Sequence, residues 1–269
     1  MEKITIPMLL KKKRLGQKIT MLTAYDYLMA KILDEVGIDV ILVGDTLGMV
    51  LLGYPNTLSV TMEDMLAHTK SVSKGVSRSL VIADMPFMSF QVSIEETIRN
   101  AGRFIKECGA EAVKIEGTNA RILSTVAALS ESGIAVMGHI GLTPQHIHQM
   151  GGYKVQGKEE EAAHKLVTSS RDLEKAGAFA IVLEGIPMVL AQEITKSISI
   201  PTIGIGAGPY CDGQVLVIHD LLGLSEGVPP KFVKQYANLR EDIAQAVKKY
   251  ILEVKAGEFP SKEFTYYAI

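Results

Sequence analysis

The sequence predicts an α/β protein built as a single (β/α)₈ barrel. A glycine suited to ending a helix, an apolar run and a polar residue near a second glycine recur together in four stretches: 36–45, 108–117, 132–141 and 176–185. Runs that are apolar almost throughout are typical of parallel strands covered by helices on both faces. Eight such units fit a closed barrel better than an open sheet, which more often has about five or six strands.

Expected strands alternate with amphipathic helices along the chain. Strands are expected at 19–24, 39–44, 80–84, 112–116, 134–139, 179–184, 201–206 and 215–218. Helices are expected at 27–36, 62–74, 93–109, 119–131, 158–176 and 187–196. The helix at 93–109 has the clearest signals, a Ser93–Glu96 capping pattern and a terminating Gly109. We expect one domain over residues 1–269, with an N-terminal extension and a C-terminal helical segment at about 229–269 that covers a barrel end or a neighbouring subunit.

Composition excludes several classes of protein. With 47% hydrophobic residues, 22% charged residues and a net charge of −2, the chain is typical of a globular protein with a large core. The basic run at 11–14 is expected to be solvated surface, so no nucleic-acid partner is predicted. Neither a signal peptide nor a run of about 18 apolar residues is recognisable, which predicts a cytoplasmic location without membrane association. Cys108 and Cys211 are expected to be free thiols.

The stretch AVKIEG at 112–117 places two opposite charges in an otherwise apolar strand. Side chains alternate along a strand, so Lys114 and Glu116 share one face. Further ionisable residues end the neighbouring expected strands: Asp45, Asp84, His139 and Glu184. An aspartate after a strand is more often a helix cap or turn former, and Lys114 could simply pair with Glu116. Buried ion pairs are seldom stabilising, however, and loops after barrel strands form the active face, so the whole set predicts an active site.

The residue types favour a hard cation. Asp45, Asp84 and Glu116 offer carboxylate oxygens, which suit Mg²⁺, whereas no cysteine or paired-histidine ligand set suggests zinc. His146 and His148 lack the HExxH spacing and are expected to be loop residues. Their loop, at 143–160, is long, polar and glycine-bearing, which predicts a cover over the site.

Six stretches in order along the chain carry a family resemblance: VGDTLGMVLLGYPNT, ADMPFMS, AVKIEG, GHIGLTPQHIHQMGGYKVQG, LEGIP and TIGIGAG. From about residue 3 to 260 the chain resembles the ketopantoate hydroxymethyltransferase family. The resemblance implies a (β/α)₈ barrel enzyme that binds one Mg²⁺ per subunit. It implies transfer of a hydroxymethyl group from 5,10-methylenetetrahydrofolate to 3-methyl-2-oxobutanoate, giving ketopantoate in pantothenate biosynthesis. It also implies a homo-oligomer, often a decamer.

The resemblance also implies roles for individual residues. It places the metal site at Asp45, Asp84 and Glu116. It places the substrate contacts at Asp45, Thr46, Asp84 and Lys114, and the proton acceptor at Glu184. Position 46 departs from the family pattern, because threonine stands where serine is expected; its hydroxyl is retained, while its methyl narrows the pocket slightly. We expect His139 to orient the substrate or folate without transferring a proton.

The chemistry of such a site can be argued from the residues. Removing a proton beside a ketone requires stabilisation of the enolate, which a divalent cation and the Lys114 ammonium supply. Three other interpretations remain open. The chain could be a Mg²⁺-dependent carbon–carbon lyase acting on 2-oxo acids, since phosphoenolpyruvate/isocitrate-lyase-like barrels perform related chemistry. Lys114 could instead form a Schiff base, or the barrel could bind a metabolite without catalysis.

Overall fold

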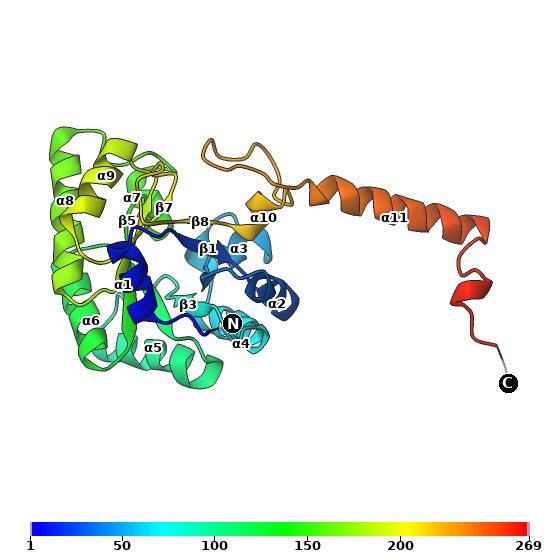
Figure 1. Ribbon diagram of the computed structural model, residues 1–269, viewed down its shortest axis with the longest axis horizontal. Helices are drawn as coiled ribbons and strands as arrows, with labels where there is room; N and C mark the ends of the chain where they lie inside the picture. Colours follow the sequence, from blue (N-terminus) through cyan, green and yellow to red (C-terminus); the bar gives the residue numbers. More distant parts are fainter. Residues whose placement is uncertain (1, 268–269) are drawn as a thin grey trace. The chain divides into compact units, whose positions relative to one another are not determined.

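The computed structural model describes residues 2–267, which fall into two compact units, one up to Val217 and one from Ile218 onward. The first unit is a closed barrel of eight parallel strands, in which β8 pairs with β1 (Figure 1). The strands are β1 (Ile19–Thr23), β2 (Val40–Val43), β3 (Leu80–Asp84), β4 (Ala112–Glu116), β5 (Ala135–Gly141), β6 (Ala180–Glu184), β7 (Thr202–Ile205) and β8 (Gly213–Leu216). The predicted (β/α)₈ barrel is confirmed.

Helices lie outside the strands, with the first helix before β1 and the others after strands β1 to β6 (Figure 1). They are α1 (Ile6–Arg14), α2 (Tyr27–Glu35), α3 (Leu47–Val50), α4 (Met62–Gly75), α5 (Ile94–Cys108), α6 (Ala120–Glu131), α7 (Ile147–Met150), α8 (Glu160–Lys175) and α9 (Met188–Ser197). Short 3₁₀ turns occur at Thr57–Ser59 and Pro144–His146. At α5 the Ser93 hydroxyl accepts a hydrogen bond from the Glu96 amide, which is one half of the expected capping box, and Gly109 adopts φ 77° as expected. The six predicted helices differ from α2, α4, α5, α6, α8 and α9 only at their ends, whereas α1, α3 and α7 were not predicted.

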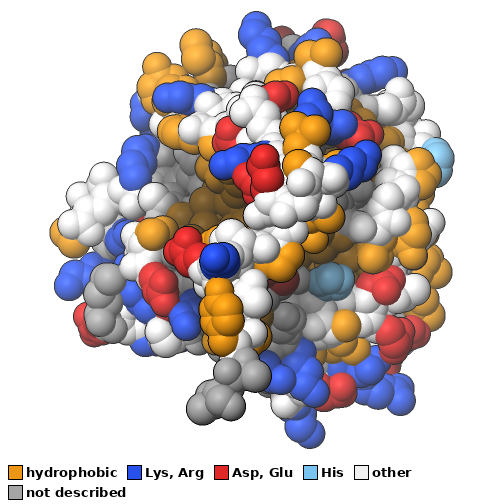
Figure 2. Space-filling view, turned by 90° about the vertical axis from the view of Figure 1, so that its right-hand side faces the viewer, with side chains coloured by type: hydrophobic (Ala, Val, Ile, Leu, Met, Phe, Trp, Pro, Cys, Tyr) orange, Lys and Arg blue, Asp and Glu red, His pale blue; other side chains and the backbone are white. Residues whose placement is uncertain are grey.

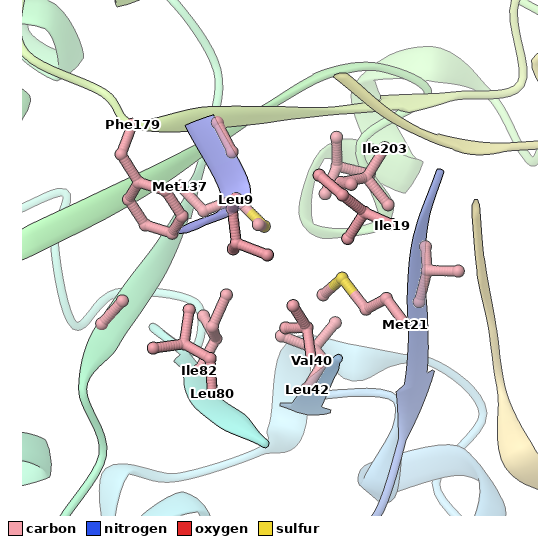
Figure 3. Close-up of a cluster of buried hydrophobic side chains, with 14 of the residues drawn as sticks. Leu9, Ile19, Met21, Val40, Leu42, Leu80, Ile82, Met137, Phe179 and Ile203 are labelled. Carbon is pink, nitrogen blue, oxygen red and sulfur yellow. The ribbon is translucent and has the colours of Figure 1, made fainter. Parts of the chain in front are cut away.

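Apolar side chains fill the barrel interior. Figure 3 shows side chains from several strands pointing toward one another, among them Met21, Leu42, Ile82 and Ile203. Leu9 of α1 joins this cluster and is 1% exposed. The N-terminal helix thus contributes to the core of the barrel.

The prediction of a solvated basic run at 11–14 is wrong for two of its residues. Lys12 Nζ lies 2.7 Å from Asp39 Oδ1, and Lys13 Nζ lies 2.8 Å from Asp212 Oδ2. Both aspartates also accept backbone N–H groups, from Thr20 and Thr202 respectively. These ion pairs join α1 to the residues that directly precede β2 and β8. The two lysines therefore hold α1 against the barrel.

The eighth strand begins two residues earlier than expected. It runs from Gly213 to Leu216, and Gly213 pairs with Ile19 of β1 and Ile203 of β7. A Cβ on Gly213 would lie 2.5 Å from the Ile19 carbonyl oxygen. The glycine therefore permits close approach of neighbouring backbones and does not end the strand.

The second unit contains α10 (Ile218–Leu221), α11 (Leu239–Ala256) and a 3₁₀ turn at Lys262–Phe264. No described residue of α11 is buried. Across residues 2–267, no helix combines the length and apolar character needed to cross a membrane. Figure 2 shows acidic and basic side chains interspersed on the face it presents. The expectations of one domain over residues 1–269 and of no nucleic-acid partner stay predictions.

Candidate active site

Inward-facing side chains change from apolar to ionisable along four neighbouring strands. The change is from Ile82 to Asp84 on β3, from Ala112 to Lys114 on β4, from Met137 to His139 on β5 and from Val182 to Glu184 on β6. Residues two apart on a strand share a face, so each ionisable group continues a row that begins in the core. Strand register aligns Asp84 with Lys114 and Glu116 with His139.

One cavity collects every predicted site residue. Its lining includes Asp45, Thr46, Asp84, Lys114, Glu116, His139 and Glu184. Apolar residues of the barrel core, such as Leu42, Val182 and Val215, also line the cavity. His146 and His148 are not among the lining residues, and they lie in the 3₁₀ turn Pro144–His146 and in α7, so the expectation that both are loop residues is wrong.

Lys114 stands among the carboxylates of this cavity. Its Nζ lies 2.6 Å from Asp84 Oδ1 and 3.9 Å from Glu116 Oε1. Burial lowers the pKa of Lys114, but the charges of Asp84, Glu116 and Asp45 outweigh burial and raise it above the ordinary lysine value. The ammonium group is therefore a permanent cation at neutral pH.

His139 links two carboxylates. Its Nδ1 lies 3.4 Å from Glu116 Oε1 and its Nε2 lies 3.2 Å from Glu184 Oε2. Burial and the Lys114 charge lower the pKa of His139, but hydrogen bonding to Glu116 and Glu184 outweighs them and raises the pKa to about 9. Lys114 Nζ also lies 3.2 Å from Nδ1, and Nδ1 can accept a hydrogen bond from this ammonium only when it carries no proton.

Asp45 and Asp84 lie next to each other, since the Asp45 amide donates to Asp84 Oδ2 at 3.2 Å. Burial raises the pKa of Asp45 to about 8, with further contributions from Asp84 and Glu116. Burial likewise raises the pKa of Asp84, although Lys114 opposes it. Glu116 differs, because hydrogen bonding and charge from His139 outweigh burial and lower its pKa. A cation beside Asp45 and Asp84 would relieve the unfavourable burial of these two carboxylates.

The donor set fits Mg²⁺. Magnesium commonly takes one or two carboxylates and completes its octahedron with water and substrate oxygens. Among residues 2–267, no three His, Cys, Asp or Glu side chains are arranged as a complete ligand set. Asp45 and Asp84 nevertheless line one cavity and both offer carboxylate oxygens, the donor type that Mg²⁺ prefers.

Gln145 also belongs to the site, although no sequence pattern predicted it as a site residue. It is 3% exposed, and its Nε2 donates to Asp45 Oδ2 at 2.9 Å. Its backbone amide donates to Glu116 Oε2 at 3.1 Å. A neutral glutamine in a loop has no sequence pattern that identifies it as a site residue. Only its position shortly after β5, the strand that carries His139, indicated that it lies near the site.

The segment at 143–160, which was expected to cover the site, contacts α3 and the residue that follows β6. Its Tyr153 hydroxyl lies 3.6 Å from Met49 Sδ of α3, and its Gln156 amide donates to the Gly185 carbonyl after β6. The pKa of Tyr153 is raised by burial and by the charges of Glu184, Asp45 and Glu116. Tyr153 therefore lies within the electrostatic field of the site carboxylates, as a cover residue would.

Solved structures share the fold. Phosphonopyruvate hydrolase in complex with oxalate and Mg²⁺ matches with a TM-score of 0.60 and 15% identity, over 98% of this chain and 93% of that one. A 2,3-dimethylmalate lyase of the PEP mutase/isocitrate lyase superfamily matches with a TM-score of 0.60 and 19% identity, over 97% and 91%. The expected phosphoenolpyruvate/isocitrate-lyase-like barrel is confirmed.

Several proteins are much more similar to this chain in sequence than these solved structures are. The 3-methyl-2-oxobutanoate hydroxymethyltransferase of Syntrophus aciditrophicus (strain SB) is 56% identical over 98% of this chain and 97% of that protein. The proteins of the same name from Thermoanaerobacter sp. (strain X514) and Clostridium botulinum (strain Langeland / NCTC 10281 / Type F) are 57% and 58% identical, over 98% and 94% of this chain and 96% and 92% of theirs. The family model for ketopantoate hydroxymethyltransferase matches residues 3–262. This chain therefore belongs to the ketopantoate hydroxymethyltransferase family, as its motifs predicted.

Proposed function

We propose that this protein transfers a hydroxymethyl group from 5,10-methylenetetrahydrofolate to 3-methyl-2-oxobutanoate and forms ketopantoate for pantothenate biosynthesis. The observation that carries the proposal is the cavity in which Asp45, Asp84, Lys114, His139 and Glu184 converge, in a chain of this family. Water is consumed and tetrahydrofolate released, because the new hydroxyl oxygen does not come from the folate.

Asp45 and Asp84 would supply carboxylate oxygens for one Mg²⁺ per subunit, with Glu116 in the same cavity. When bound there, the ion supplies positive charge beside the ketone oxygen, where negative charge develops as the enolate forms. Thr46 directly follows Asp45 and lines the same cavity, so its hydroxyl can donate to the substrate carboxylate.

Glu184 is the proposed base for the C3 proton of 3-methyl-2-oxobutanoate. It ends β6, lines the cavity and lies 3.2 Å from His139 Nε2. The imidazole lies between the two carboxylates, with its Nδ1 3.4 Å from Glu116 Oε1. In this proposal His139 positions Glu184 and lines the cavity that receives the substrate. Glu184 takes the C3 proton.

Lys114 adds a second positive charge for the developing enolate. Asp84 holds its ammonium at 2.6 Å, so the group is fixed before substrate enters. The same contacts argue against a Schiff base, because a lysine must lose its proton to attack a carbonyl. The raised pKa of Lys114 keeps that proton in place.

The lyase interpretation is less well supported than the transferase. The relatives named hydroxymethyltransferase are 56–58% identical, whereas the dimethylmalate lyase is 19% identical and shows the fold alone. Incubation with 3-methyl-2-oxobutanoate, Mg²⁺ and 5,10-methylenetetrahydrofolate should yield ketopantoate, measured by mass spectrometry. Cleavage of a 2-oxo acid without folate would favour the lyase, and a borohydride-trapped lysine adduct with chelator-resistant activity would favour the Schiff base.

Self-association is proposed as well, as a homo-oligomer and specifically a homodecamer. It is supported by α11, whose Val247, Tyr250 and Leu252 are each at least half exposed. Apolar side chains of this kind favour burial against a partner surface. Sedimentation equilibrium would give the subunit number, and a monomer at all concentrations would refute the proposal. The cytoplasmic location stays a prediction.

A further inference from the structure

Gln145 joins loops that follow four consecutive strands. From the turn after β5 (Ala135–Gly141), its Nε2 donates to Asp45 Oδ2 and to the Met85 carbonyl, both at 2.9 Å. Its backbone amide donates to Glu116 Oε2, and its Oε1 accepts from Gln91 Nε2 at 3.2 Å. A single side chain thereby connects the ends of β2, β3 and β4 to the segment that follows β5.

Chemistry fixes the orientation of this amide. Asp45 Oδ2 and the Met85 carbonyl oxygen are both acceptors in these contacts, so only the NH₂ group can face them. Flipping the amide would turn its oxygen toward two oxygens and lose both bonds. Two donated bonds and one accepted bond, all with little or no exposure to solvent, leave Gln145 a single rotamer.

A neutral donor suits this position better than any charged side chain. A lysine between Asp45 and Glu116 would form ion pairs and compete with a divalent cation for the same oxygens. A glutamate would add repulsion to a cluster in which Asp45 is already crowded by Asp84 and Glu116. The amide orients Asp45 through one oxygen while it leaves the charge of the carboxylate available to a cation.

From these contacts we propose that Gln145 is a positioning residue that holds the Asp45 carboxylate in the orientation needed to bind the divalent cation. Through its backbone bond to Glu116, the residue also links the segment after β5 to the carboxylate cluster. The inference rests on the proposed function for the presence of that cation. It assigns a role to a side chain that need not touch the substrate.

Isothermal titration calorimetry with Mg²⁺ alone tests this directly. The variants are Gln145→Met, which keeps the side-chain length without donors, and Gln145→Asn, which keeps the amide but shortens its reach. Partners that orient a metal ligand typically contribute about 10- to 100-fold in affinity, so the Mg²⁺ Kd should rise by about that factor in both variants. Gln156→Met is the matched control, because its Nε2 donates only to Lys154 in the same segment, and its Kd should match wild type.

Kinetics separates positioning from a purely structural role. The apparent Mg²⁺ constant for ketopantoate formation should rise, while kcat at saturating Mg²⁺ stays within a few-fold of wild type. Should Gln145→Met fail to fold by circular dichroism, Gln145→Asn decides the matter. Folded variants with an unchanged Mg²⁺ Kd, even if less stable to heat, would overturn the inference and leave the proposed function intact. Wild-type protein that binds no Mg²⁺ would overturn both.

Discussion

Lys114 Nζ lies 2.6 Å from Asp84 Oδ1, and the two side chains are only 5% and 4% exposed. They come from aligned positions on β4 and β3, so the barrel register itself sets this pair. Removing two charges from water costs several kcal/mol per ion, which apolar packing would avoid. A buried ion pair at the end of a row of core residues is consistent with the proposed catalytic role of Lys114 and Asp84.

Replacing Lys114 by methionine should destabilise the metal-free protein by about 3–5 kcal/mol, because Asp84 and Glu116 would be left buried without their cation. Urea denaturation monitored by circular dichroism measures the change. Mg²⁺ should recover part of the loss, since it supplies replacement positive charge. A variant as stable as wild type without metal would show that the carboxylates do not depend on this ammonium.

Glu184→Gln should slow exchange of the C3 proton of 3-methyl-2-oxobutanoate by at least about 10²-fold, the usual scale for a lost base. Substrate affinity should change little, because the amide keeps the size of the side chain. NMR in deuterium oxide follows the exchange. Glu193→Gln, on the exposed surface of α9, is the control and should exchange normally. Undiminished exchange in Glu184→Gln would remove this residue from the role of base.

Asp84→Ala should abolish Mg²⁺-dependent binding of 3-methyl-2-oxobutanoate. The substitution removes both a proposed metal ligand and the anchor of Lys114. Calorimetric titration of substrate with and without Mg²⁺ measures the effect, with Asp172→Ala on α8 as the control. Ordinary magnesium dependence in the Asp84 variant would refute its role as a ligand.

Asp34 should contribute stability that depends on pH. It accepts backbone N–H bonds from Ser77, Arg78 and Ser79 at the start of β3. Burial raises the pKa of Asp34, but these bonds outweigh it and hold the pKa well below its usual range. A lowered folded-state pKa stabilises the protein above the unfolded value of about 3.9, and this contribution is lost as pH falls through the folded-state value.

Asp34→Asn should therefore lower the free energy of unfolding by about 2 kcal/mol at neutral pH, the scale of hydrogen bonds to a charged group. The difference from wild type should shrink as pH falls below about 3.9. Urea denaturation over this pH range measures both values. A difference that grows toward acid pH would contradict the assignment.

Sequence patterns predicted the barrel because four of the stretches combine a helix-ending glycine, an apolar run and a second glycine, and because expected strands alternate with amphipathic helices along most of the chain. They also predicted the site, since Lys114 and Glu116 break an apolar face at a strand end where the active face must lie. Gln145 escaped prediction because its bond to Asp45 joins residues 100 positions apart, and neither residue type nor spacing encodes that contact. Lys12 and Lys13 were misinterpreted for the same reason, as their partners are distant in the chain.

Deuterium exchange at C3 of 3-methyl-2-oxobutanoate, followed by NMR with and without Mg²⁺ and in the absence of folate, tests most directly whether this cavity forms an enolate. Exchange should be fast with Mg²⁺ and should fall to the uncatalysed rate with chelator. Two results would contradict an enolate formed by Glu184 beside the Asp45 and Asp84 carboxylates. One is exchange at the same rate with and without Mg²⁺, and the other is no exchange at all in protein that makes ketopantoate.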